Sequence, residues 1–407
     1  MPPQGYSQRP LTNSSQTACL PVHYEPSRPA HLYVDRIYLA KGSSPTPERR
    51  EFVARICALY PDAERINCPE TPHNRTGLQE REPLARHAAG KRTLVFGVHA
   101  SALRFSSEEG NTCPNYWHFS PYGFCPHGCK YCYLAGTPAF WHSPTLRIFV
   151  NLGEILRAID GAATQAARPT AFYLGKLQDG LALDPLTAYS TVLVPFFARH
   201  KFARQVILTK SAQVERLLDL DHAGHTILSW SLNPPEIVSH FEENVPSAEE
   251  RLQAMKRCAE RGYPLRAVLM PIIPVDDWET IYSRFLGTLL AAVPISRLTL
   301  GGICIYRNAL ALMERKLGRS NAISLNIAPG SNGGTSRDCG IVAGAGARQR
   351  DGRARYAAGL RVAMYSRLLR IARELRPDLE LALCLEEPSV LQAVNLQHRL
   401  GLCNCVL

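Results

Sequence analysis

The sequence predicts an α/β protein: a partial (β/α)6 TIM-like barrel preceded by a small N-terminal α/β module. Short apolar segments of strand type alternate with segments of helical periodicity over most of the chain. Parallel strands joined by crossover helices produce that alternation, either in a barrel or in an open α/β sheet. A loop with three cysteines directly follows the first strand of the series. This position suits a barrel, because the sites of such barrels lie at the carboxyl ends of their strands.

The elements of the module come first in the chain. Residues 1–30 are rich in Pro, Ser and Gln, and we expect a disordered tail there. The alternating segment 31–39 predicts a strand, and 46–60 predicts a helix with proline in its first turn. A second strand is predicted at 92–98. The module is therefore expected to occupy residues 31–112.

The barrel segment is expected over residues 113–317, where six strands alternate with five helices. The predicted strands are 117–122, 170–174, 205–209, 227–232, 267–272 and 298–303. The predicted helices are 152–166, 187–199, 211–218, 248–262 and 277–292.

The composition changes after the barrel. Residues 318–352 are rich in Gly, Ala and Ser, which predicts a flexible loop. Residues 353–407 form the C-terminal region, with a predicted helix at 353–376, a strand at 379–385 and a cysteine-containing tail.

Composition also restricts location and partners. The formal net charge of +11 favours an anionic partner such as DNA or another nucleic acid. Thirteen cysteines without a signal peptide indicate a reducing environment, so we expect a cytoplasmic protein. No apolar run is long enough to span a membrane, and no membrane partner is expected.

The loop with three cysteines carries the strongest chemical signal. Cys125, Cys129 and Cys132 follow the spacing Cys-x3-Cys-x2-Cys. Three thiolates on one short loop can bind three irons of a [4Fe–4S] cluster and leave the fourth iron open for chemistry. A zinc site with His127 as fourth ligand and a set of buried structural cysteines are the alternatives. The odd number of cysteines and the absence of a signal peptide disfavour a disulfide framework.

With Tyr131 placed before the third cysteine, the loop resembles the signature of radical S-adenosylmethionine (SAM) enzymes. Further landmarks occur in the order found in the spore photoproduct lyase family, which repairs a thymine dimer in DNA. They are 92–98, 129–134, 208–210, 231–233, 241–242, 249–252 and 261–265, so the resemblance covers about residues 31 to 300. It implies a [4Fe–4S] cluster, SAM cleaved to a 5′-deoxyadenosyl radical, and an external electron donor of flavodoxin or ferredoxin type.

The resemblance implies roles in SAM binding or radical relay for residues near the cluster loop and at strand ends. For each of them, the alternative is ordinary packing or a position that faces solvent. Tyr131 is expected beside the adenine of SAM, and Tyr133 is a candidate for radical relay. The candidates for polar contacts with SAM are Lys210 with its carboxylate, Ser231 and Asn233 with its ribose or carboxylate, and Asp179 with a ribose hydroxyl.

One departure from the family matters. The hydrogen-donating cysteine of the lyase lies on the loop after the second barrel strand, where this chain has Gly175 or Lys176. The chain therefore either acts on another substrate or uses another donor. Cys403 and Cys405 are the candidate substitutes. With Cys384, and similarly Cys113, they could instead bind a second metal or be buried free cysteines.

The sequence therefore predicts a radical SAM enzyme acting on a nucleic-acid base or lesion. Without a substitute donor, it predicts weak or absent repair of the spore photoproduct. One alternative is a radical SAM enzyme with a small-molecule or peptide substrate. The other is a non-catalytic iron–sulfur or zinc protein that binds nucleic acid.

Overall fold

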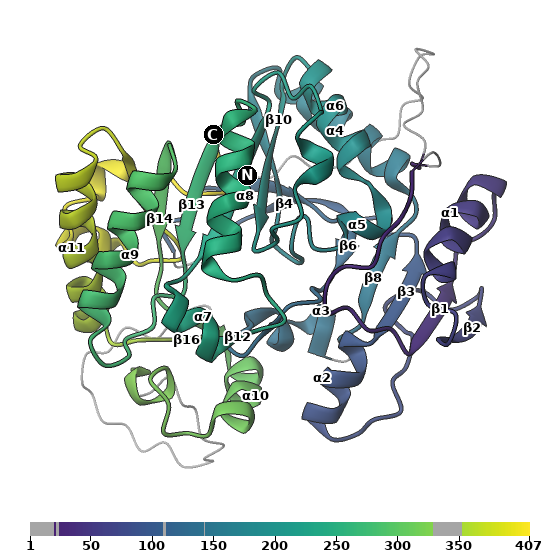
Figure 1. Cartoon of the computed structure of the whole chain (residues 1–407), viewed down its shortest axis with the longest axis horizontal. Helices are drawn as coiled ribbons and strands as arrows, with labels where there is room; N and C mark the ends of the chain where they lie inside the picture. The colour runs from purple at the N-terminus through teal and green to yellow at the C-terminus, as the bar shows by residue number, and fades with distance from the viewer. Residues whose placement is uncertain (1–19, 22–23, 109–110, 142, 329–351) are drawn as a thin grey trace.

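The computed structural model describes residues 20–21, 24–108, 111–141, 143–328 and 352–407. Two sheets dominate the fold, a large one in the barrel and a smaller one beside it, to the right in Figure 1. The large sheet has the strand order β17-β14-β13-β11-β10-β9-β5-β4. All of its neighbouring strands are parallel except β4 and β5.

The six predicted barrel strands are six consecutive neighbours in the large sheet. They are β5 (Tyr116–Phe119), β9 (Thr170–Leu174), β10 (Ala203–Thr209), β11 (Thr226–Leu232), β13 (Leu265–Leu269) and β14 (Arg297–Leu300). The strand expected at 379–385 forms as β17 (Glu380–Leu383) and adds a seventh parallel strand beside β14. The barrel therefore extends into the C-terminal region.

Helices cover the outside of the barrel, and four of the five predicted ones form. These are α4 (Leu152–Ala166), α6 (Ser190–Arg199), α8 (Ala248–Glu260) and α9 (Trp278–Ala292), and the later helix α11 (Ala358–Leu375) packs against α9.

The helix predicted at 211–218 was wrong, because only the short 3-10 turn η2 (Glu215–Leu217) forms. The Thr209 hydroxyl accepts from the backbone N–H of Ser211, and the Ser211 hydroxyl accepts from that of Gln213. Such side-chain bonds to nearby backbone compete with helix formation.

The smaller sheet has the order β2-β1-β3-β8-β6. Its strands are β1 (Arg36–Ala40), β2 (Glu64–Cys68), β3 (Thr93–Gly97), β8 (Leu146–Phe149) and β6 (Tyr122–Gly123), with helices α1 (Pro47–Ala58) and α2 (Pro83–Lys91). Strands β8 and β6 come from the predicted barrel segment, whereas β4 (Leu103–Ser106) comes from the predicted module and joins the barrel. The predicted boundary between residues 112 and 113 therefore does not separate the two sheets. Strand β8 lies after the boundary but pairs with β3, and β4 lies before it but pairs with β5.

Shorter elements complete the described part of the chain. They are β7 (Gly128–Cys129), η1 (Tyr133–Gly136), α3 (Pro138–Trp141), α5 (Asp184–Thr187), α7 (Pro235–Phe241), β12 (Glu242–Glu243), β15 (Cys304–Tyr306), α10 (Arg307–Leu317), η3 (Ser324–Asn326), β16 (Arg353–Arg355), α12 (Pro388–Ala393) and η4 (Gln397–Arg399).

Two predicted irregular segments are only partly described. Residues 1–19 and 22–23 of the expected disordered tail, and 329–351 of the expected loop, lie outside the described residues. The rest of the predicted tail is ordered: Leu20 is buried, and the Tyr24 hydroxyl donates to the Leu186 carbonyl at 2.5 Å. Leu20 and Tyr24 therefore hold this stretch against the hydrophobic core despite its polar composition.

The hydrophobic core is continuous between the two sheets. The ring of Tyr189 stacks on Tyr122 at 5.4 Å and on Phe52 of α1 at 5.6 Å between ring centroids. Within the described residues, no helix is both long and apolar enough to cross a bilayer.

Candidate active site

A cavity of about 270 Å³ opens at the carboxyl ends of the barrel strands. Residues at or just after the ends of β9, β10, β11, β13, β14 and β17 line it, together with the loop that follows β5. Barrel enzymes place their chemistry at this end, so the cavity is the candidate active site.

All three cysteines of the loop line this cavity: Cys125, Cys129 and Cys132. The loop is fixed by the fold, because β7 pairs antiparallel with β12. The ammonium group of Lys91 donates to the carbonyls of Cys125 and His127, the latter at 2.8 Å. These contacts fix the backbone that carries the three thiols.

The side chains at the cavity distinguish the two metal hypotheses. In the described part of the chain, no three His, Cys, Asp or Glu side chains converge closely enough to bind a single metal ion. His127, the fourth ligand of the zinc hypothesis, has Nδ1 3.1 Å from the Asn244 carbonyl and Nε2 3.5 Å from Asp179. His127 also lines the cavity, but its ring nitrogens face Asn244 and Asp179, and the three cysteine thiols form a donor set that suits iron–sulfur chemistry.

Burial governs the protonation of the Cys125 and Cys129 thiols. It raises the pKa of Cys129 to about 12 and raises that of Cys125 as well. Thiolates are the form that binds metal, so loading the site must release protons.

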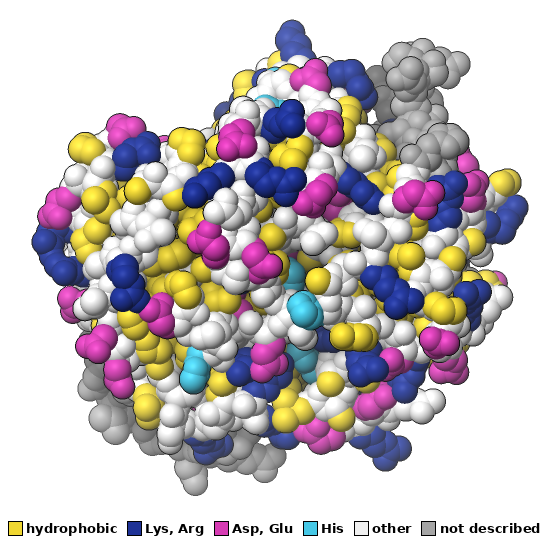
Figure 2. Space-filling view, viewed as in Figure 1, with side chains coloured by type: hydrophobic (Ala, Val, Ile, Leu, Met, Phe, Trp, Pro, Cys, Tyr) yellow, Lys and Arg dark blue, Asp and Glu magenta, His cyan; other side chains and the backbone are white. Residues whose placement is uncertain are grey.

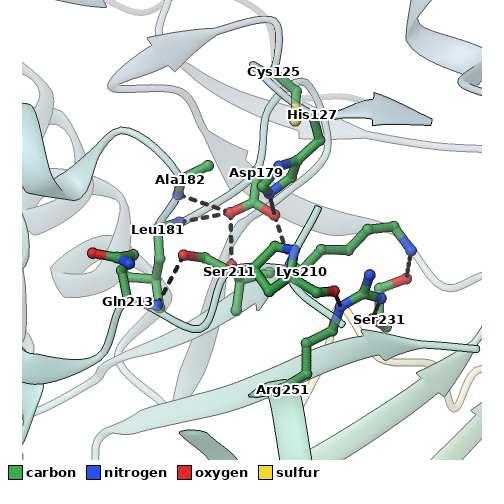
Figure 3. Close-up of polar contacts among 12 residues, drawn as sticks. Cys125, His127, Asp179, Leu181, Ala182, Lys210, Ser211, Gln213, Ser231 and Arg251 are labelled. Carbon is green, nitrogen blue, oxygen red and sulfur yellow. Dashed lines mark hydrogen bonds and ion pairs between the residues drawn. The ribbon is translucent and has the colours of Figure 1, made fainter. Parts of the chain in front are cut away.

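Asp179 was expected to contact a ribose hydroxyl, but its carboxylate is already engaged by the protein (Figure 3). It accepts from the backbone N–H groups of Leu181, Ala182 and Lys210 and from the hydroxyl of Thr209, at 2.6 to 2.9 Å. Burial alone would raise the pKa of Asp179, yet the bonds from His127, Thr209 and Lys210 lower it to about 2. Asp179 therefore shapes the loops after β9 and β10 and positions His127; it also lines the cavity, and its contact with a ribose hydroxyl stays a prediction.

Behind the cavity wall lies a buried carboxylate that the sequence analysis used only as a family landmark. Glu242 of β12 accepts from four side chains: Lys210 Nζ at 3.0 Å, Asn233 Nδ2 at 3.2 Å, an Arg251 terminal nitrogen at 2.5 Å and the Tyr131 hydroxyl. Burial alone would raise the pKa of Glu242, but the charges of Lys210 and Arg251 outweigh burial and hold it well below its usual range. No local spacing connects these positions, so only the fold brings them together.

The predicted SAM contacts divide into two groups. Tyr131, Lys210 and Ser231 line the cavity, and the Lys210 ammonium donates to the Ser231 hydroxyl at 2.8 Å, as Figure 3 shows. Asn233 is fully buried outside the lining, and its side-chain oxygen accepts from the Tyr282 hydroxyl at 3.0 Å. Asn233 positions Tyr131 and Glu242, and its predicted contact with SAM stays a prediction.

Five further cysteines line the same cavity: Cys113, Cys304, Cys384, Cys403 and Cys405. The tail cysteines, predicted near the barrel mouth, thus line the cavity of the cluster loop. Tyr133 also lines the cavity, and its hydroxyl donates to the carbonyl of Lys176.

A family model described as "Spore photoproduct lyase" matches residues 54–300. The chain belongs to the spore photoproduct lyase family. It is 33% identical over 238 residues to the spore photoproduct lyase of Geobacillus sp. (strain Y412MC61). The matched segment covers 56% of this chain and 67% of that relative. It is 30% identical over 227 residues to that of Bacillus subtilis (strain 168), covering 55% and 64%. The match thus spans about two thirds of each relative.

Solved structures give the same result for the fold. A spore photoproduct lyase complexed with dinucleoside spore photoproduct has a TM-score of 0.70 at 22% identity, covering 87% of this chain and 100% of that one. A double mutant of the lyase with bound AdoMet and the same dinucleoside has a TM-score of 0.70 at 22% identity, covering 86% and 98%. The predicted radical SAM barrel and the predicted family are confirmed, and with them an enzyme of the radical SAM lyase type.

Proposed function

We propose that the chain uses a [4Fe–4S] cluster and SAM to repair a thymine lesion of the spore photoproduct kind in DNA. The observation that carries this proposal is the placement of Cys125, Cys129 and Cys132 on the wall of one cavity, in a chain of this family. When bound, the cluster and SAM supply one-electron cleavage of the sulfonium to a 5′-deoxyadenosyl radical. The three cysteines would hold the cluster.

Cavity residues support the binding of SAM. The Lys210 ammonium stands 5.7 Å from the centroid of the Tyr131 ring and is held by Glu242 and Ser231. A cation fixed in this way can make charge-assisted hydrogen bonds to the SAM carboxylate. Ser231 offers a hydroxyl to the same ligand, and the Tyr131 ring offers a flat face to adenine.

Family and charge support the nucleic-acid substrate. The two curated relatives are named for the spore photoproduct, and the net charge of +11 favours an anionic partner. On the face shown in Figure 2, basic and acidic side chains are interspersed, so the excess charge is not gathered into one patch there. A damaged base would have to leave the helix stack to reach the cavity. The external electron donor would be of flavodoxin or ferredoxin type. The protein would act in the cytoplasm.

The ligand assignment is tested by anaerobic reconstitution. The wild-type chain should hold about four irons and four sulfides. Replacing Cys125, Cys129 and Cys132 with Ala should abolish that iron. The matched control replaces three cysteines outside the cavity, Cys57, Cys68 and Cys258, and should keep it. Full iron content in the first variant would show that other residues bind the cluster.

The chemistry is tested by reducing the loaded protein with dithionite in the presence of SAM. Chromatography should detect 5′-deoxyadenosine and methionine even without substrate. Their absence from a fully loaded, reduced protein would favour the non-catalytic alternative. Steep weakening of DNA binding with added salt supports the nucleic-acid substrate, because phosphate contacts release counterions. A flat salt response would favour the small-molecule alternative.

A further inference from the structure

The residues after Leu402 occupy the interior of the barrel. Arg266 of β13 donates to the Asn404 carbonyl at 3.1 Å, and Arg297 of β14 donates to the carbonyls of Cys403 at 2.6 Å and Val406 at 3.0 Å. Both arginines are buried and are direct partners across neighbouring strands. In Figure 1 the end of the chain lies beside β13 and β14, which agrees with these bonds.

A third strand fixes the same segment by a side-chain bond. The hydroxyl of Ser229 in β11 donates to the side-chain oxygen of Asn404 at 2.6 Å. Three adjacent strands therefore hold residues 403–406 by their backbone and by the one polar side chain among them. This anchoring determines where the thiols on either side of Asn404 lie.

The anchored thiols lie against the ends of two other strands. Cys403 and Cys405 form one apolar cluster with Tyr116 of β5 and Tyr173 of β9, and both line the cavity of the cluster loop. The backbone N–H of Cys405 donates to the sulfur of Cys403 at 3.3 Å. Burial raises the pKa of Tyr173, and a charge on Cys405 would raise it further, in keeping with their proximity.

The loop after β9 has no room for a thiol of its own at Gly175. A Cβ atom there would lie 2.6 Å from the Cβ of Leu208, and the φ angle of Gly175 is +156°. The next residue, Lys176, is committed to other partners, with its ammonium 3.0 Å from Glu108 and 2.9 Å from the Ser106 hydroxyl. Any thiol at this part of the cavity must come from elsewhere in the chain.

We propose that Cys405 donates a hydrogen atom to the substrate radical, with Cys403 as its neighbouring thiol. This proposal rests on the proposed function. The substrate carbon radical takes the hydrogen atom of the Cys405 thiol, so one S–H bond breaks, one C–H bond forms and a thiyl radical remains. One electron from the external donor and one proton from solvent then restore the thiol. Cys405 is favoured over Cys403 because Cys403 is the more deeply buried, at 1% against 8% exposed.

A labelling experiment tests the donor assignment. Thiol hydrogens exchange with solvent, so in D2O the wild-type enzyme should place one deuterium in the product of a dinucleotide spore photoproduct. Cys405→Ser should lower labelled product by about tenfold or more while forming 5′-deoxyadenosine within about twofold of wild type. Cys258→Ser, at a buried cysteine outside the cavity, should match wild type.

Three results separate the possible failures. Undiminished labelled product from Cys405→Ser overturns the donor assignment. A wild-type enzyme that forms 5′-deoxyadenosine but no repaired product overturns the proposed repair of this lesion, and the donor assignment falls with it. A loaded, reduced wild-type enzyme that forms no 5′-deoxyadenosine overturns the proposed function itself.

A second measurement uses the cluster-free protein and requires no turnover. The same dinucleotide should slow alkylation of Cys405 by N-ethylmaleimide, mapped by mass spectrometry, and should leave Cys258 unaffected. Binding of the dinucleotide to Cys405→Ser should stay within about twofold of wild type, since a donor acts after binding. Unchanged alkylation of Cys405 at saturating dinucleotide would overturn the proposal, because the thiol would then lie away from the substrate.

Discussion

Neutralising the buried carboxylate behind the cavity should destabilise the whole chain. Glu242 and Arg251 both have side chains with no exposed surface, and the contact between them is 2.5 Å. Glu242→Gln leaves the Arg251 cation buried without its counter-charge. Breaking a buried pair from one side typically costs about 3–5 kcal/mol. A domain's entire unfolding free energy is only about 5–15 kcal/mol, so the loss should be large.

The assay is urea unfolding of the cluster-free protein under anaerobic conditions. The matched control is Glu243→Gln at the next residue, whose side chain is 61% exposed and lies 3.1 Å from Lys130. Exposed pairs contribute about 0–1 kcal/mol, so the control should change little. Removing both buried charges in Glu242→Gln/Arg251→Met should recover part of the loss. Equal unfolding free energies for the Glu242 and Glu243 variants would refute the reasoning.

Three further predictions concern SAM binding, stability at acid pH and packing around two glycines. Lys210→Met should keep the cluster but weaken SAM binding by about tenfold or more, as a spectroscopic titration would show; unchanged affinity would contradict the role of Lys210. Burial lowers the pKa of His73 from 6.5 to about 3 and of His99 to about 4, so each side chain stays neutral when folded. The unfolded chain takes up protons first, so stability should be full above pH 6.5 and fall toward pH 4, by about 1.4 kcal/mol per pH unit for each histidine. A His73→Leu/His99→Leu variant should flatten the dependence of stability on pH, measured as urea unfolding midpoints. An unchanged dependence would refute the role of the two histidines. Gly161→Ala should raise the unfolding free energy by about 0.5–1 kcal/mol, because open space surrounds the new methyl group. Gly90→Ala should lower the unfolding free energy, because its Cβ would lie 2.3 Å from the Pro144 carbonyl oxygen. Equal effects of the two substitutions in thermal unfolding would contradict the packing argument.

The barrel was predictable because its strands and helices carry strong local patterns. The strand 170–174 is nearly all buried, and buried parallel strands appear in sequence as continuous apolar runs. The helix 152–166 has buried residues at helical spacing, including Leu152, Ile155, Leu156 and Ile159, and both elements formed with the predicted bounds. Cysteine spacing likewise predicted the loop that lines the cavity.

Long-range polar contacts were not predictable in the same way. Glu242 meets Tyr131 across 111 positions, and Arg297 meets the carbonyl of Cys403 across 106 positions. A buried charge has no periodic signature, so its partner is visible only once the chain is folded. For the same reason, Asp179 and Asn233 were predicted as ligand contacts although the protein itself uses their polar atoms.

The anchoring of residues 403–406 inside the barrel has a consequence for the order of folding. The contact between Ser229 and Asn404 spans 175 positions, and Arg266 reaches the same residue across 138. During synthesis, the strands from β5 to β14 leave the ribosome well before the segment that fills the space between them. Until that segment arrives, Arg266 and Arg297 lack the carbonyl acceptors that it supplies, and a closed barrel would enclose polar groups left unsatisfied. The barrel interior should therefore be completed late in folding, and nascent chains stalled before residue 403 should remain sensitive to proteases.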